Sequence, residues 1–129
     1  MQNPDYQDAI ALALSRTRHD RLRSDPALWQ KMILSFKNAT AKEAPELFAD
    51  VHFDIRNPER PYSEQIDGFL AGMRWKGALI LWPGGEESAY EMPKLAKQSI
   101  NEGQSRNLSG YVRIINDMAN IIDETLGVD

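Results

Sequence analysis

The sequence predicts a mainly α-helical protein, a small bundle of four to five helices. Apolar residues recur at steps of three and four positions in several segments, and capping residues or prolines separate these segments. The 129 residues, 42% of them hydrophobic, suffice for one domain whose core needs no disulfide, and cysteine is absent. We therefore expect a single helical domain over residues 1–129.

The composition also limits the kinds of partner that we expect. A formal net charge of −4 disfavours binding of nucleic acid by the domain as a whole, since such domains are usually basic. The N-terminal segment MQNPDYQDAI lacks the basic and long apolar parts of a signal peptide. We expect a cytoplasmic protein without a cofactor or a bound metal, because zinc sites use cysteine or clustered histidine.

Residues 4–23 are predicted to form the first helix. Asp5 and Asp8 lie near its start, and four arginines lie near its end, an order that suits the helix dipole. These arginines are Arg16, Arg18, Arg21 and Arg23. The alternative interpretation is a local contact with phosphates or with an acidic partner.

A second helix is expected from Pro26 to about Lys37, after the capping sequence Ser24-Asp25-Pro26. Thr40–Glu43 fits a capping box, but Pro45 moves the expected helix start to Ala44–Pro45. Residues 51–55 alternate like a short strand, although the last turn of a helix is the alternative. Two prolines and an asparagine predict a loop over residues 56–61.

The segment IDGFLAGMRWKGALILW, residues 66–82, carries one apolar stripe that predicts a helix of four turns. Asp67, Arg74 and Lys76 interrupt it, so it does not read as a membrane span, which needs about 20 nearly uncharged residues. The alternative is that residues 78–82 form a strand that pairs with residues 51–55, giving a short β pair.

Small residues and tryptophans mark this segment as a candidate interface. Gly68 and Gly72 lie four positions apart and would let another backbone approach, either a helix of the same chain or a partner. Trp75 lies off the apolar stripe, which indicates either a partner contact or the edge of the core. The residues predicted here to bind a partner are Gly68, Gly72, Arg74, Trp75 and Trp82.

Pro83-Gly84-Gly85 is read as a turn, and residues 89–97 as a weaker helix that follows Glu86-Glu87. The strongest periodicity runs from Leu108 to Leu126, where Ile114 and Ile121 widen the apolar face to about half of the helix circumference. So wide a face predicts self-association or a protein partner that covers these two isoleucines.

We find no pattern that predicts an enzyme. His19 and His52, the two histidines of the chain, lack a metal-binding spacing, and no nucleophile elbow or phosphate-binding loop occurs. No pair of carboxylates is placed by sequence across a cleft. The expectation is therefore a protein that is not an enzyme, with an unrecognised small enzyme as an alternative.

Two segments resemble a pattern of small tailed-phage proteins encoded near the portal and head genes, a glycine and an arginine entering an apolar helix. They are Phe69–Arg74 followed by Ala78-Leu79-Ile80, and Asn101–Arg106 followed by Tyr111–Ile115. In the second segment an extra residue separates Gly103 from Arg106. The resemblance covers about a third of the chain and implies a virion or assembly protein, located in the host cytoplasm or the virion.

These observations predict a protein whose activity is binding, most simply a phage-type structural or assembly component that forms a homo-oligomer or docks on one. The alternative of another class is a small acidic inhibitor or adaptor that blocks a host protein, of the anti-defence type. The mixed charge of the chain fits that alternative less well than a strongly negative charge would.

Overall fold

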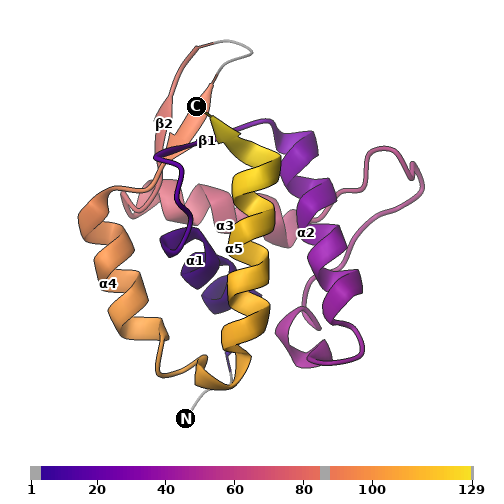
Figure 1. The fold of residues 1–129 in the computed structure, drawn as a ribbon. Coiled ribbons are helices and arrows are strands. Elements are labelled where there is room, and N and C mark those ends of the chain that lie inside the picture. Colours follow the sequence, from indigo (N-terminus) through magenta and orange to yellow (C-terminus); the bar gives the residue numbers. More distant parts are fainter. Residues whose placement is uncertain (1–3, 85–87, 129) are drawn as a thin grey trace.

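The computed structural model describes residues 4–84 and 88–128, and confirms that the protein is mainly helical (Figure 1). The helices of the described residues are α1 (Tyr6–Ser15), α2 (Pro26–Thr40), α3 (Glu64–Trp75), α4 (Lys94–Gln104), α5 (Val112–Leu126) and the 3₁₀ turns η1 (Pro45–Leu47) and η3 (Ser109–Tyr111). No helix in this part of the chain is long and apolar enough to cross a membrane.

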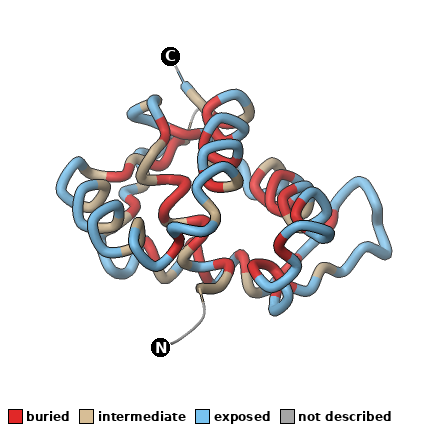
Figure 2. The backbone as a smooth tube through the Cα atoms, turned by 60° about the horizontal axis from the view of Figure 1, so that its bottom comes forward, coloured by how far each residue is buried: buried red, intermediate tan, exposed pale blue. Residues whose placement is uncertain are grey.

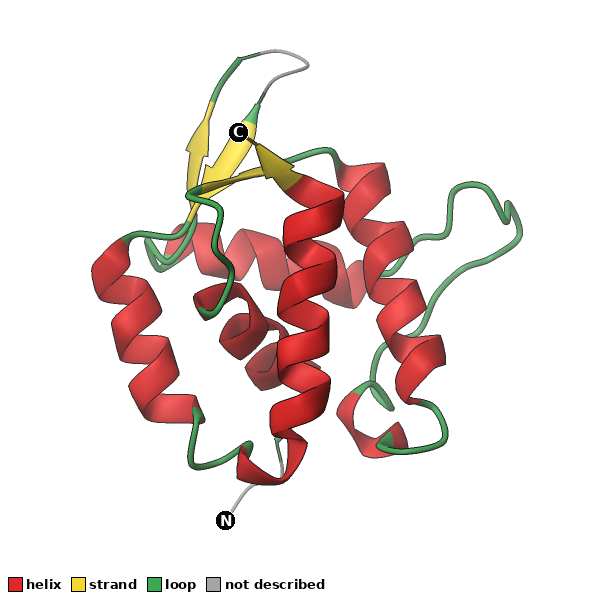
Figure 3. Ribbon diagram, viewed as in Figure 1, coloured by secondary structure: helices red, strands yellow, loops and turns green. Residues whose placement is uncertain are grey.

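The bundle carries a small antiparallel sheet at one end, so it is not a pure helical bundle (Figure 3). Its strands, in the spatial order β2-β3-β1-β4, are β2 (Ile80–Trp82), β3 (Ala89–Glu91), β1 (Arg21–Arg23) and β4 (Gly127–Val128). The predicted β pair is wrong in its partner, because residues 80–82 pair with residues 89–91. Within residues 51–55, Asp54 forms only an isolated bridge with Tyr62.

The first helix is shorter than the predicted 4–23. Asp5 caps α1 through a capping box with Asp8, as the early acidic residues suggested, but α1 ends at Ser15. Asp123, on α5, accepts hydrogen bonds from the backbone N–H groups of Arg18 and His19 at 2.9 and 3.0 Å. These groups are thereby removed from a helical ladder, and the chain continues as β1 between β3 and β4.

The helix predicted over residues 66–82 ends at Trp75, and a tight turn leads into β2. Gly77 has φ +77°, a conformation that side-chain-bearing residues rarely adopt. The N–H groups of Ala78 and Leu79 both donate to the Met73 carbonyl, at 2.9 and 3.1 Å. The apolar stripe over residues 66–82 therefore does not form one helix. Gly77, in the left-handed conformation, divides it into helix α3 and strand β2.

The helices predicted from Pro26 and from Leu108 are confirmed with shifted bounds, as α2 and α5. Asp25 caps α2, accepting from Ala27 N–H at 3.0 Å. The helix expected at Ala44–Pro45 is the 3₁₀ turn η1, and the weak helix expected over 89–97 is instead β3 followed by α4. The predicted turn at Pro83-Gly84-Gly85 and the Glu86-Glu87 pair lie partly or wholly outside the described residues.

Helix α1 occupies the centre of the molecule and packs against α4 and α5, while α2 packs against the other side of α5 (Figure 1). The buried residues form one cluster, and the backbone segments that carry them are red in Figure 2. The mostly exposed loop over residues 52–62 projects from the helices. Trp29 is 1% exposed and packs edge to face against Tyr90, with the two ring centres 5.8 Å apart. Helix α4 has no fully buried residue, but its partly buried Ala96 and Ile100 pack against the core.

Candidate functional site: a groove between α3 and the edge strand β2

An open groove of about 520 Å³ lies between the end of α3 and strand β2. We call it the α3–β2 groove; its lining residues are Ala71, Arg74, Trp75, Gly77, Leu79, Ile80 and Leu81. A second hollow of about 340 Å³ shares Ala71 and Arg74 with it and extends toward Tyr90. Arg74 therefore lies where the two hollows meet, with its guanidinium on the surface.

Trp75 is the most exposed large apolar side chain among the described residues, with 92% of its surface accessible. Its backbone ends α3, where Lys76 and Gly77 turn the chain away. A tryptophan in this position gains nothing from the core, so the sequence-based alternative that Trp75 caps the core edge is wrong. An exposed tryptophan beside a groove is a typical anchor for a partner.

Strand β2 forms one edge of the sheet of the described chain, because it pairs with β3 alone. The other side of an edge strand presents backbone N–H and C=O groups that no neighbouring strand of the sheet receives. The α3–β2 groove thus combines a helix wall with a free strand edge. This arrangement can accept an extended chain by main-chain pairing.

Trp82 lies on the solvent face of β2 and is 42% exposed. The guanidinium carbon of Arg21 lies 4.8 Å from the centre of the Trp82 ring, a cation–π contact between β1 and β2, which lie on either side of β3. Arg21 also reaches Glu91, with Nε 3.8 Å from Oε1. Trp82 is therefore partly covered by the chain itself, and Trp75 is the freer of the two predicted anchors.

The predicted arginine cluster does not form one surface. Arg16 donates from its guanidinium to Asn101, Ser105 and Asn116 at 3.1 to 3.2 Å, which joins α1 to α4 and α5. Arg18 is largely exposed and lies 3.7 Å from Asp123, whereas Arg21 stacks on Trp82. Arg23 remains exposed on β1. The helix-end interpretation of this cluster is wrong beyond Arg16, since β1 holds Arg21 and Arg23.

The two isoleucines of α5 lie apart from the α3–β2 groove. Ile114 is half-buried against the core and Ile121 is 37% exposed. Both line a hollow of about 110 Å³ between α2 and α5, which shares no lining residue with the groove. The apolar face of α5 is thus mostly used in the core, by Ile115, Met118 and Ile122.

Gly68 and Gly72 open a different feature, a cavity of about 570 Å³ among α1, α3 and α4, which we call the glycine cavity. A Cβ added at Gly68, Gly72 or Gly103 would meet nothing within 4 Å. The expectation that a helix of the same chain packs into the Gly68–Gly72 notch is therefore wrong. Each glycine costs about 1 kcal/mol relative to alanine inside a helix, and no close packing in the described structure requires that cost.

Polar groups from three elements line the glycine cavity. Asp8 comes from α1, Gln65 and Lys76 from the two ends of α3, and Ser99 and Gln104 from α4. Partial burial raises the pKa of Asp8, against the hydrogen bond from Asp5 N–H that lowers it. The floor of the glycine cavity is apolar, and its lining residues include Phe69, Met73 and Ile100.

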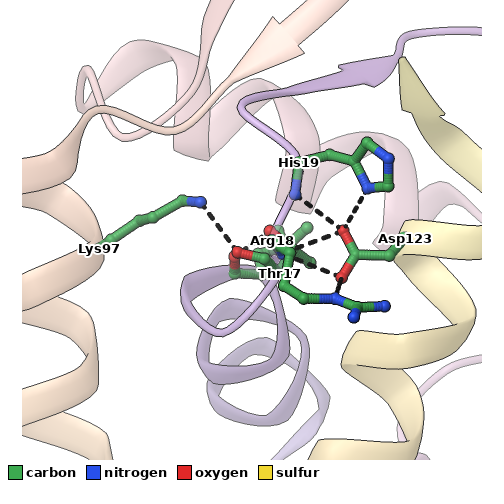
Figure 4. A network of polar contacts seen from close by, with 6 residues as sticks. Thr17, Arg18, His19, Lys97 and Asp123 are labelled. Carbon is green, nitrogen blue, oxygen red and sulfur yellow. Dashed lines mark hydrogen bonds and ion pairs between the residues drawn. The ribbon is translucent and has the colours of Figure 1, made fainter. Parts of the chain in front are cut away.

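The buried carboxylate of Asp123, shown in Figure 4, is the centre of another polar network. Its contacts are all within the chain, so we assign it a structural role and not a binding role. It accepts from the backbone of Arg18 and His19 and lies 2.9 Å from Nδ1 of His19. Beside it, the Lys97 ammonium and the Thr17 carbonyl are 3.1 Å apart, which ties α4 to the same loop. The described residues contain no cluster of three His, Asp or Glu side chains suited to a metal ion.

Sequence reasoning missed several residues of both hollows, notably Asp8, Ala71, Lys76 and Ile80. Each is ordinary in sequence and becomes part of a site only because other elements lie opposite. The glycine spacing was a usable signal, since all three cavity glycines interrupt helices without a turn to explain them. Compared with protein-family models, curated proteins and solved structures, the chain finds no match that would place it in a family.

Proposed function

We propose that this protein is a non-enzymatic interaction protein that binds an extended segment of a partner along β2. The observation that carries the proposal is the 92% exposure of Trp75 beside the α3–β2 groove. An extended partner would add a strand to the β2 edge and place one side chain in the groove. Its main-chain bonds would provide affinity, and the groove would provide specificity.

Charge around the groove indicates the character of the segment. The groove is lined by one charged residue, Arg74, whereas the nearby Lys76 lines the hollow on the opposite side of α3. Neither side chain has a hydrogen bond or ion pair within the part of the chain that the structure describes. A segment that carries a carboxylate next to an apolar residue would pair with Arg74 and cover Trp75, since Arg favours planar bidentate contact with carboxylates.

The biological setting that we propose is the assembly of a phage-type particle, in which the partner is a neighbouring structural protein. The support is that residues 69–80 and 101–115 resemble small proteins of tailed phages. The first of these segments also supplies most of the residues that line the groove. A second copy of the chain and a host protein are the competing partners, and the experiment below separates them.

The first measurement is the mass in solution by gel filtration with light scattering, over a concentration series of the chain alone and of the chain co-expressed with the products of its flanking genes. We expect a stable complex with one flanking product that protects the β2 amides from hydrogen exchange. The double change Trp75→Ser and Arg74→Ser should abolish this complex without lowering the melting temperature.

Leu95→Ser is the matched control, because Leu95 is also highly exposed, at 81%, but lies on α4 away from the groove. A complex that tolerates the Trp75 and Arg74 changes contradicts the proposed surface. A closed oligomer of the chain alone that depends on Trp75 would assign the groove to a second copy. A chain that stays monomeric with every flanking product contradicts the assembly function.

A further inference from the structure

We propose that the glycine cavity is a second binding site, for a small zwitterion with an apolar body, such as an apolar amino acid or a short apolar peptide. This site is independent of the α3–β2 groove. It lies on the opposite side of α3, and the two hollows share no lining residue.

Opposite charges line the cavity without neutralising each other. Asp8 lies on α1 and Lys76 at the end of α3, and within the described residues they form no ion pair with one another. Within the described residues, the Asp8 carboxylate accepts one hydrogen bond, from the backbone N–H of Asp5 at 3.3 Å, and the Lys76 ammonium makes none. A ligand with one positive and one negative end would complement both groups.

A further hydrogen-bond donor, from Gln65, lies at the opposite end of α3 from Lys76 and would support a polar group elsewhere along the ligand. The side-chain oxygen of Gln65 accepts from the N–H of His52 at 3.1 Å and from the hydroxyl of Ser63 at 2.9 Å. These bonds fix the amide and leave its Nε2 without a partner among the described residues. A polar rim around a floor formed by Phe69, Met73 and Ile100 suits a ligand that has charged ends and an apolar side chain.

The size of the cavity also fits. About 570 Å³ lies within the range of roughly 300 to 1,000 Å³ that small-molecule sites occupy. Gln65 and Lys76 flank α3 at its two ends, so the cavity follows about 16 Å of helix length at 1.5 Å per residue. That length leaves room for a single amino acid at one end or for a peptide of up to about four residues at about 3.5 Å each.

The first test fills the cavity. Gly72→Leu places a side chain in the hollow where an added Cβ meets nothing within 4 Å, so the fold should keep or raise its melting temperature. The control is Ala71→Leu, which makes a similar change on the adjacent residue but faces the α3–β2 groove. We expect Gly72→Leu to abolish ligand binding and keep partner binding, and Ala71→Leu to do the reverse.

The second test uses defined probes in calorimetric and NMR titrations: L-phenylalanine, the dipeptide Ala-Phe and the tripeptide Ala-Ala-Phe. N-acetyl-Ala-Phe lacks the ammonium and Ala-Phe amide lacks the carboxylate. We expect at least one zwitterion to bind with a Kd of about 1 mM or lower, and each singly charged dipeptide to bind about tenfold more weakly than Ala-Phe. The order of affinity among the three zwitterions distinguishes a free amino acid from a peptide.

Asp8→Asn should weaken the binding of Ala-Phe but leave the affinity for N-acetyl-Ala-Phe unchanged. Lys76→Gln should weaken the binding of Ala-Phe but leave the affinity for Ala-Phe amide unchanged. Lys31→Gln is the control for loss of a positive charge, because Lys31 is an exposed residue of α2 that does not line the cavity. The proposal is overturned if no zwitterion binds the folded wild-type chain, if Gly72→Leu and Gly68→Leu bind as well as the wild type, or if removal of either charge from the probe has no effect. Each of these results leaves the groove proposal standing.

Discussion

The Nδ1 atom of His19 lies 2.9 Å from Oδ1 of Asp123, joining the loop after α1 to the last turns of α5 (Figure 4). The Asp123 side chain is 2% exposed, so water cannot replace the hydrogen bonds that it accepts. This carboxylate holds the loop that leads directly into β1, the strand between β3 and β4. Disturbing it should loosen the sheet from the bundle.

Asp123→Asn should destabilise the fold by about 2 to 4 kcal/mol, because an amide has one acceptor oxygen where the carboxylate uses two. The measurement is urea unfolding at pH 7, with Asp117→Asn on the exposed face of α5 as the control. A loss of less than about 0.5 kcal/mol, which is the effect of an ordinary surface substitution, would contradict the structural role of Asp123.

The same carboxylate predicts a pH dependence. Burial acts to raise the pKa of Asp123, but the hydrogen bonds from Arg18 and His19 outweigh it, and the pKa is lowered. A lowered pKa stabilises the folded state fully above the unfolded value of about 3.9, and this stabilisation is lost as the pH falls through the folded pKa. The stability difference between wild type and Asp123→Asn should therefore shrink below about pH 4; a constant difference down to pH 2 would contradict this.

Two glycines should respond to alanine with opposite signs. A Cβ at Gly127 would overlap the Asp123 carbonyl oxygen and the His19 ring, whereas a Cβ at Gly103 meets nothing within 4 Å. We expect Gly127→Ala to lower stability by at least about 1 kcal/mol and Gly103→Ala to raise it by about 0.5 to 1 kcal/mol. Melting temperatures of the two variants check both signs in one experiment.

Gln30 and Ser63 exchange two hydrogen bonds that connect α2 to the start of α3. The Gln30 Nε2 donates to the Ser63 carbonyl at 3.1 Å, and the Ser63 N–H donates to Gln30 Oε1 at 3.0 Å, both in the interior. Gln30→Ala should cost about 1 to 3 kcal/mol, since it leaves the buried Ser63 N–H unpaired, while the Ser63 carbonyl keeps only the Asp67 N–H at 3.3 Å. Gln98→Ala, on the exposed face of α4, is the matched change that should have little effect; equal losses would contradict the argument.

Replacing Trp29 should lower the stability of the protein far more than replacing Trp75, because Trp29 is buried and Trp75 is exposed. Trp29 donates from its indole N–H to the Arg23 carbonyl at 2.7 Å and is 1% exposed. Trp29→Phe should cost about 1 to 3 kcal/mol, whereas Trp75→Ser should change stability by no more than about 0.5 kcal/mol. Chemical denaturation decides this, and a large loss for Trp75→Ser would show that Trp75 contributes to packing.

The parts of the fold that the sequence predicted correctly rest on local physics. Helical periodicity and capping act over neighbouring turns, so Asp25-Pro26 marked the start of α2 and the stripe from Leu108 onward marked α5. The prolines of residues 56–61 agree with the absence of helix and strand there, and the position of Trp75 off its apolar stripe agrees with its exposure of 92%. The glycines at 68 and 72 were recognised as a notch, though not as part of a cavity.

Only the tertiary structure decided the sheet and the two hollows. Strands of two or three residues carry no readable periodicity, and they form because β1 finds β3 and β4 on its two sides. The glycine cavity is the space left where α1, α3 and α4 meet, so it depends on packing between residues about 90 positions apart in sequence. Local preferences set where helices begin and which residues stay outside, and long-range packing determines which surfaces remain open for binding.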